Sequence, residues 1–148
     1  MGQGAGEMSL YKNTLNLIGK KFQLGSQELD NGIDCFTLIV TYLRNRGVDI
    51  PKDETFKGLT FDSYKNEYLK DKTLLMQTAV EYLKSKTDKI TNSQVTAGDI
   101  LLIKSHNGNL SFGIDTGNGS ALSISESDGV VSLSKNDFKV IEAFRCRA

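Results

Sequence analysis

The sequence predicts an α+β domain in which N-terminal helices pack on an antiparallel β-sheet formed by the C-terminal half. Before about residue 90, apolar residues recur at helical spacing, whereas short β-type runs divided by glycine-containing turns follow Val95. Helices first and strands second are typical of an α+β domain. The 148 residues, of which 39% are hydrophobic, are enough for a single packed core.

Four helices are expected in the first half. Ser9 can cap a helix that runs to about Ile18 and ends at Gly19. Asp34 is the N-cap of a second, mostly apolar helix, which Gly47 ends after a basic last turn. Two more lie near residues 61–70 and 72–86, within a lysine-rich helical insertion at about 54–90. Because acidic residues interleave with these lysines, the insertion is best explained by a solvated helical face.

The strands are expected in the second half, with turns at glycine pairs such as Asn107-Gly108. We predict strands at 100–104, 110–116, 120–125, 129–133 and 139–145. No internal repeat or linker interrupts residues 9–148, which we interpret as one domain. Residues 1–8 are interpreted as a flexible leader or a cloning scar.

The charge and the cysteine content limit which classes of partner and which cellular compartment we expect. Eighteen basic residues balance eighteen acidic ones, so no overall basic field attracts nucleic acid. The apolar runs are far shorter than the roughly 20 residues that cross a bilayer, so we expect no membrane insertion. Two cysteines indicate reduced thiols, although a single disulfide bridge between them is an alternative. The first residues lack the pattern of a secretory signal peptide.

Cys35 is the candidate nucleophile. It lies in the first turn of the second predicted helix, where the helix dipole and free backbone N–H groups favour the thiolate. The same N–H groups can help to form an oxyanion hole. The alternative is that Cys35 fills core volume beside its apolar neighbours. Cys146, near the end of the last strand, is interpreted as a small structural residue.

Several short motifs in a fixed order resemble the NlpC-type cell-wall peptidases, which are papain-like cysteine endopeptidases. The motifs span about residues 15–125 and are Gly19–Gly25, Asp34–Ile39, Gly47–Pro51, Ala97–Leu102 and Ser111–Gly119. The resemblance implies a papain-like fold and a thiolate that attacks a peptide bond in the peptidoglycan stem peptide.

Three features look most like the branch of this family found in bacteriophage tail proteins. They are the aromatic residue after Cys35, the insertion at 54–90 and the ending Ile141–Arg145. This resemblance implies other tail proteins as partners. It also implies synthesis in the host cytoplasm, without a signal peptide, followed by incorporation into a virion tail.

The site departs from the family pattern at three polar positions. Ser111 stands where the family has its histidine base, Ser123 where it has the orienting residue, and Phe22 where a tyrosine precedes the nucleophile. Asp34 and Phe22 are the candidate substrate-binding residues, and Asp34 would position the substrate beside the nucleophile in an active enzyme. A serine hydroxyl does not accept a proton near neutral pH, so Ser111 cannot form the thiolate–imidazolium pair that the reaction needs.

His106 is the only histidine, so any imidazole-dependent mechanism must use it. It lies in a predicted turn five residues before Ser111. At about 3.3 Å per strand residue, an outward-projecting turn places it roughly 15 Å from the base position. Two interpretations of His106 remain: a catalytic base brought to the site by a folded-back turn, or a solvated residue of the turn. One histidine without clustered cysteines or carboxylates provides no metal site, and we expect no cofactor.

Two classes of function follow. The first is a catalytically degenerate or weak NlpC-like domain that serves as a structural or assembly component of a phage tail or tail-like particle. The second is an active cysteine endopeptidase of peptidoglycan that uses Cys35 with His106 or a base supplied by a partner. A module that binds peptidoglycan in the same cleft without cutting it is a third reading.

Overall fold

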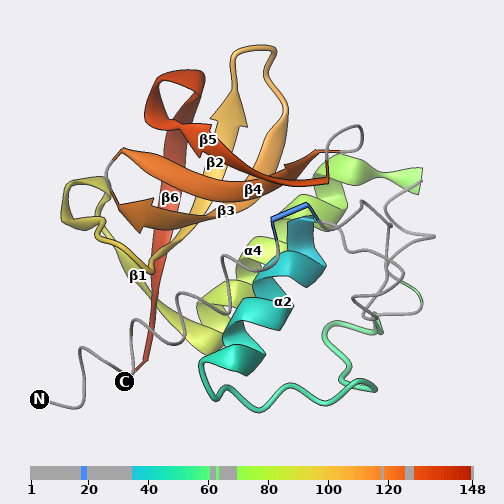
Figure 1. Cartoon of the computed structure of the whole chain (residues 1–148). Coiled ribbons are helices and arrows are strands. Elements are labelled where there is room, and N and C mark those ends of the chain that lie inside the picture. The colour runs from blue at the N-terminus through green and yellow to red at the C-terminus, as the bar shows by residue number, and fades with distance from the viewer. Residues whose placement is uncertain are drawn as a thin grey trace, which may run out of the picture.

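The computed structural model describes residues 18–19, 35–60, 63, 70–117, 119–125 and 129–147. Within these residues, helices α2 (Cys35–Asn45) and α4 (Lys72–Lys86) pack on one face of a six-stranded antiparallel sheet (Figure 1). The predicted α+β architecture is therefore confirmed. No helix in this part of the chain has the length and apolar character needed to cross a bilayer.

The sheet has the strand order β1-β6-β2-β3-β4-β5, so the last strand of the chain lies between the first two. Strands β2 to β5 form consecutive antiparallel neighbours, and β6 pairs with both β1 and β2. The strands are β1 (Thr87–Ile90), β2 (Ile100–Ser105), β3 (Leu110–Gly117), β4 (Ser120–Ser125), β5 (Gly129–Ser134) and β6 (Phe138–Cys146).

Five of these strands match the predicted runs to within one residue at each end. Strand β1 was not predicted, because it lies at the end of the segment expected to be helical. Thr87 ends α4 there: its hydroxyl and its backbone N–H both donate to the carbonyl of Leu83. The four residues of β1 lack alternation of their own, so the strand depends on its pairing with β6.

The two described helices begin and end where the sequence predicted. Residues 36–40 of α2 are all buried, which agrees with its apolar composition. Asp71 caps α4 by accepting a hydrogen bond from the backbone N–H of Leu74 at 3.0 Å. The predicted helix at 9–18, that near 61–70 and the leader lie outside the described residues, except for a turn at Ile18–Gly19 and helical geometry at Ser63 and Lys70.

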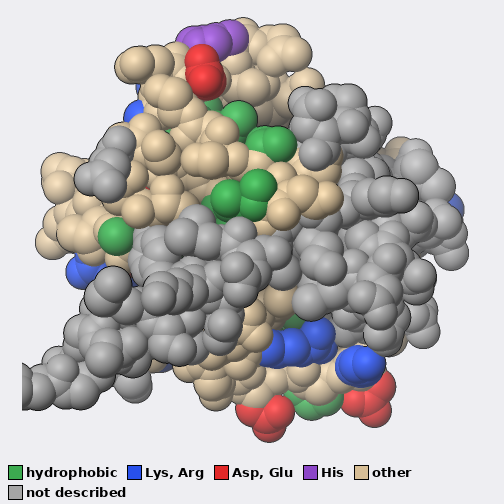
Figure 2. Space-filling view, viewed as in Figure 1, with side chains coloured by type: hydrophobic (Ala, Val, Ile, Leu, Met, Phe, Trp, Pro, Cys, Tyr) green, Lys and Arg blue, Asp and Glu red, His purple; other side chains and the backbone are tan. Residues whose placement is uncertain are grey.

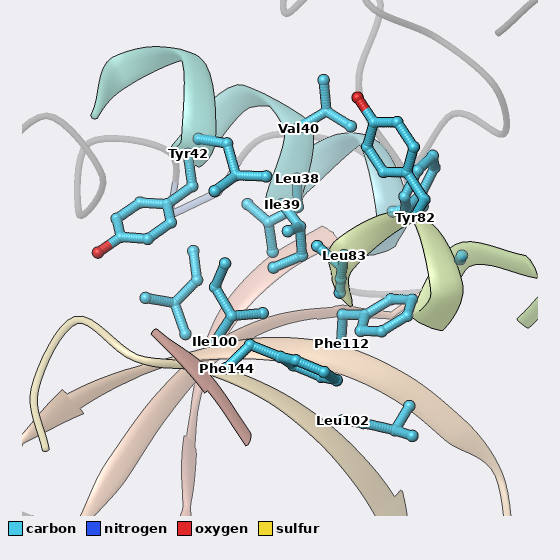
Figure 3. Close-up of a cluster of buried hydrophobic side chains, with 14 of the residues drawn as sticks. Leu38, Ile39, Val40, Tyr42, Tyr82, Leu83, Ile100, Leu102, Phe112 and Phe144 are labelled. Carbon is cyan, nitrogen blue, oxygen red and sulfur yellow. The ribbon is translucent and has the colours of Figure 1, made fainter. Parts of the chain in front are cut away.

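The sheet carries a hydrophobic cluster on each face. The larger cluster lies between the sheet and the two helices and includes Leu38, Leu83, Phe112 and Phe144 (Figure 3). The smaller one, on the opposite face, includes Leu101, Ile103 and Phe138. Because strand side chains alternate between faces, each residue of β3 can be assigned to one of these two environments.

Candidate functional site

The N-terminus of α2 provides the first part of the candidate site. Cys35 is the first residue of this helix, so it lies at the positive end of the helix dipole. This is the setting that the sequence predicted for a nucleophile. The side chain of Cys35, and the residues Asp34 and Phe22, lie outside the described part of the structure, so their predicted roles stay predictions.

Ser111 and Ser123 form the second part of the site. Their hydroxyl oxygens lie 3.3 Å apart across β3 and β4, and the hydroxyl of Ser123 donates to the carbonyl of Phe112 at 2.8 Å. Ser123 is 1% exposed, whereas Ser111 is half-buried. The two residues that the sequence resemblance matches to the base and the orienting residue are therefore in direct contact.

The hydrogen bonds of this serine pair determine which of the two hydroxyl groups is the donor. Each hydroxyl has one hydrogen, and that of Ser123 is used by the carbonyl of Phe112. Ser111 must then donate its own hydrogen to Ser123, which leaves the oxygen of Ser111 as an acceptor. An acceptor of this kind can receive an N–H group of a peptide, but its oxygen is too weakly basic to deprotonate a thiol.

The two parts of the site are linked by a contact between Phe36 and Phe112. Helix α2 packs against β3 and β4, and the ring centroids of these two residues lie 6.4 Å apart. Phe36 follows Cys35 in the chain, and Phe112 follows Ser111. Helix α2 and strand β3 therefore pack against each other through the residues that directly follow Cys35 and Ser111.

By strand alternation, Ser111 lies on the face of β3 opposite Phe112, together with Gly113. Ser123 lies on this face too, because Leu122 and Ile124 belong to the helix-covered cluster. A Cβ atom on Gly113 would come within 3.0 Å of the carbonyl oxygen of Leu122. Glycine at position 113 therefore permits the close approach of β3 and β4 that holds the serine pair together.

The structure places His106 in the turn between β2 and β3, with its side chain exposed. Its Nε2 lies 3.0 Å from the carbonyl oxygen of Asn136, in the turn between β5 and β6, so Nε2 is the donor. A histidine surface is visible at the upper margin of Figure 2. His106 therefore contacts a neighbouring turn, whereas Ser111 contacts Ser123.

Two further observations concern cysteine and metal chemistry. Cys146 is a free, half-buried thiol at the end of β6, so the bridge that the sequence left open is absent. Burial raises the pKa of this thiol and disfavours its thiolate. Within the described ranges, no group of three or more histidine, cysteine or acidic side chains is placed to hold a metal ion.

Comparison with known proteins identifies the family. The sequence model of the NlpC/P60 family matches residues 19–144, which is most of the chain. The chain belongs to the NlpC/P60 family. Comparison with curated protein sequences gives no significant match. The family's papain-like α+β fold agrees with the two helices and the antiparallel sheet described above.

Solved NlpC/P60 domains share this fold. The NlpC/P60 domain of the peptidoglycan hydrolase SagA is 23% identical, with a TM-score of 0.58 over 91% of this chain and 94% of that one. The P60 domain of antigen MAP1204 from M. avium subspecies paratuberculosis is 16% identical, with a TM-score of 0.59 and coverage of 98% and 97%. RipD from Mycobacterium tuberculosis is 16% identical, with a TM-score of 0.52 and coverage of 92% and 93%.

Sequence reasoning paired Ser111 with Ser123 but missed the aromatic packing around them. Tyr82 of α4 packs edge-on against Phe36, and its hydroxyl donates to the carboxylate of Glu54. The only signal was an aromatic residue directly after Cys35 and another directly after Ser111. Motif spacing does not show that these two rings meet, because they come from a helix and a strand far apart in the chain.

Proposed function

We propose that this NlpC/P60 domain is catalytically degenerate or weak and that it binds the stem peptide of peptidoglycan. The observation that supports this most directly is the Ser111–Ser123 hydrogen bond, because the sequence resemblance matches Ser111 to the family's base. The hydroxyl pair satisfies its own hydrogen bonds and leaves an acceptor for a peptide N–H group. It supplies no group that can take the thiol proton near neutral pH.

The expected loss of rate is large. Removal of a general base typically lowers a rate by about 10²–10⁴, and by more when the base is part of a triad. Cys35 at a helix N-terminus would keep some thiolate character, because the dipole favours the anion. The proposal therefore allows slow turnover but excludes the rate of an enzyme with an imidazole beside its thiol.

Two structural relatives support the substrate class and the loss of activity. SagA is described as a peptidoglycan hydrolase, and RipD as a non-catalytic NlpC/P60 protein adapted to peptidoglycan binding. Both adopt this fold. We therefore propose that this chain binds peptidoglycan, which both relatives are described to bind or act on, and that it has lost most or all of its catalytic activity, as RipD has.

The finer part of the proposal is a role as a structural or assembly component of a phage tail or tail-like particle. Its support is the sequence resemblance carried by Phe36, the insertion at 54–90 and the ending Ile141–Arg145. The chain would be made in the host cytoplasm and then built into the tail beside other tail proteins. Peptide mass spectrometry of purified particles should detect it in stoichiometric amounts, and its absence from them would remove this role.

The binding and cleavage parts are tested together with muropeptides. In the ¹⁵N-labelled domain, a stem peptide should shift the amide resonances of residues 111–113 and 123, while chromatography finds little or no product. Cleavage at an ordinary enzymatic rate that Cys35→Ala abolishes would overturn the proposal in favour of an active endopeptidase. In that case His106→Ala would show whether His106 or an external base serves the thiol.

A gain-of-function variant provides the matched control. Ser111→His places an imidazole beside Ser123, whose hydroxyl can orient it. If the missing base is the reason for inactivity, this variant should cleave muropeptides at least about 10²-fold faster than the parent. Addition of Cys35→Ala should remove the gained activity. An unchanged rate, with binding intact, would show that something other than the base limits catalysis.

A further inference from the structure

The strongest feature outside the serine pair is the buried side chain of Tyr82 on α4. Its ring is 4% exposed and makes edge contacts with two other rings: Phe36, with centroids 5.6 Å apart, and Phe56, with centroids 5.4 Å apart. The interplanar angles are 80° and 83°, which is the T-shaped geometry that aromatic pairs favour. Tyr82 therefore joins the segment before α4 to the beginning of α2.

The hydroxyl of Tyr82 is fixed as firmly as its ring. It donates to the carboxylate of Glu54, which also accepts from Nζ of Lys86 at 2.9 Å. A buried tyrosine hydroxyl needs such a partner, because leaving it unpaired costs free energy. The ring therefore cannot withdraw from this position without breaking a hydrogen bond to a charged group.

Phe36 connects the fixed ring of Tyr82 to the candidate site. It is the residue after Cys35, and its ring contacts that of Phe112, the residue after Ser111. The ring of Phe36 therefore contacts α4 on one side and β3 on the other. A change in the position of Phe36 would move the first turn of α2 relative to β3.

We propose that Tyr82 is a positioning residue for the first turn of α2, and that Glu54 holds its ring in the orientation that does this. The inference rests on and deepens the proposed function, because that turn begins with Cys35. It gives the segment 54–86 a role in the geometry of the site. Tyr82 itself acts through Phe36.

The test compares three substitutions in the ¹⁵N-labelled full chain. Tyr82→Leu removes the ring contacts and should shift the amide resonances of residues 35–37 and 112. It should also change the iodoacetamide alkylation rate of Cys35 severalfold, as followed by peptide mass spectrometry. Tyr82→Phe keeps the ring and should restore most of both readouts. Glu54→Gln, a milder change, should produce smaller shifts at the same residues.

Tyr42 offers a matched control on α2 itself. It is as deeply buried as Tyr82, and its hydroxyl donates to the carbonyl of Gly98 at 2.7 Å. Figure 3 shows the hydroxyl groups of Tyr42 and Tyr82 at opposite ends of the core. Tyr42→Leu should lower the unfolding free energy as Tyr82→Leu does, but should leave the resonances of residues 35–37 unchanged.

The outcomes separate this inference from the proposed function. If Tyr82→Leu and Glu54→Gln lower stability without moving the resonances of residues 35–37, the positioning role is wrong. It is also wrong if Tyr42→Leu moves these resonances as much as Tyr82→Leu does. If Tyr82→Leu fails to fold, Glu54→Gln alone decides. A stem peptide added to the unsubstituted chain reports on the proposed function independently, since its binding does not depend on either substitution.

Discussion

Asp99 shows how a single buried carboxylate can hold the end of the sheet. It is 3% exposed, and its two oxygens accept from Nε and Nη2 of Arg145 at 3.0 and 2.9 Å. One of them also accepts from the backbone N–H of Thr96 at 2.9 Å. Two parallel bonds from one guanidinium give such a pair more geometric definition than a single contact does.

Removal of Arg145 should therefore be costly. Arg145→Met leaves Asp99 buried without its cation, and we expect the free energy of unfolding to fall by about 2–3 kcal/mol. Lys89→Met, which breaks the exposed 3.2 Å ion pair with Glu142 on the neighbouring strand, should change it by less than about 0.5 kcal/mol. Urea denaturation measures both changes, and equal losses would contradict the importance assigned to the cation that pairs with the buried Asp99 carboxylate.

At the scale of elements, the tight turn between Phe56 and Leu59 contains an unfavourable residue. Phe56 and Leu59 exchange two backbone hydrogen bonds, and the two residues between them both have positive φ: 51° at Lys57 and 78° at Gly58. Turns of this kind favour asparagine followed by glycine, because asparagine tolerates the left-handed region. Lysine at the first position is strained.

Lys57→Asn should accordingly stabilise the protein by about 0.5–1 kcal/mol. The substitution gives up an ion pair with Glu81, but both side chains are at least half exposed, so that loss is small. The midpoint of urea unfolding should rise with an unchanged slope. Lys57→Val, which puts a β-branched residue at positive φ, should lower it, and a reversed order would show that the turn is not strained.

The elements also show what sequence patterns can and cannot predict. Helix α4 and strand β4 begin and end where periodicity and turns placed them, because their signals are local. Strand β1 was missed because its residues are specified by pairing with β6, more than fifty positions away. The same distinction holds at the candidate site: the family resemblance singled out Ser111 and Ser123 and their roles stay predictions, but only the packing of α2 on β3 shows the contact of Phe36 with Phe112.

For the whole molecule, acid should weaken the fold partly through Glu54. Burial opposes ionisation of this carboxyl, but hydrogen bonds from Tyr82 and Lys86 outweigh burial and lower its pKa below the ordinary 4.5. The resulting stabilisation is fully present above the unfolded-state pKa and is lost as pH falls through the folded-state value. In Glu54→Gln, the unfolding free energy should depend less on pH below about 4.5. An unchanged pH dependence would show that other carboxyls account for it.

The strand order has a consequence for how the chain is made. Of the six described strands, β6 leaves the ribosome last, yet it lies between β1 and β2. A nascent chain that has emerged only as far as β5 can form the hairpins from β2 to β5, but β1 then has no neighbour to pair with. Translation must therefore deliver the final strand before the sheet can close, which leaves the apolar surfaces of β2 and α4 open to chaperones until then.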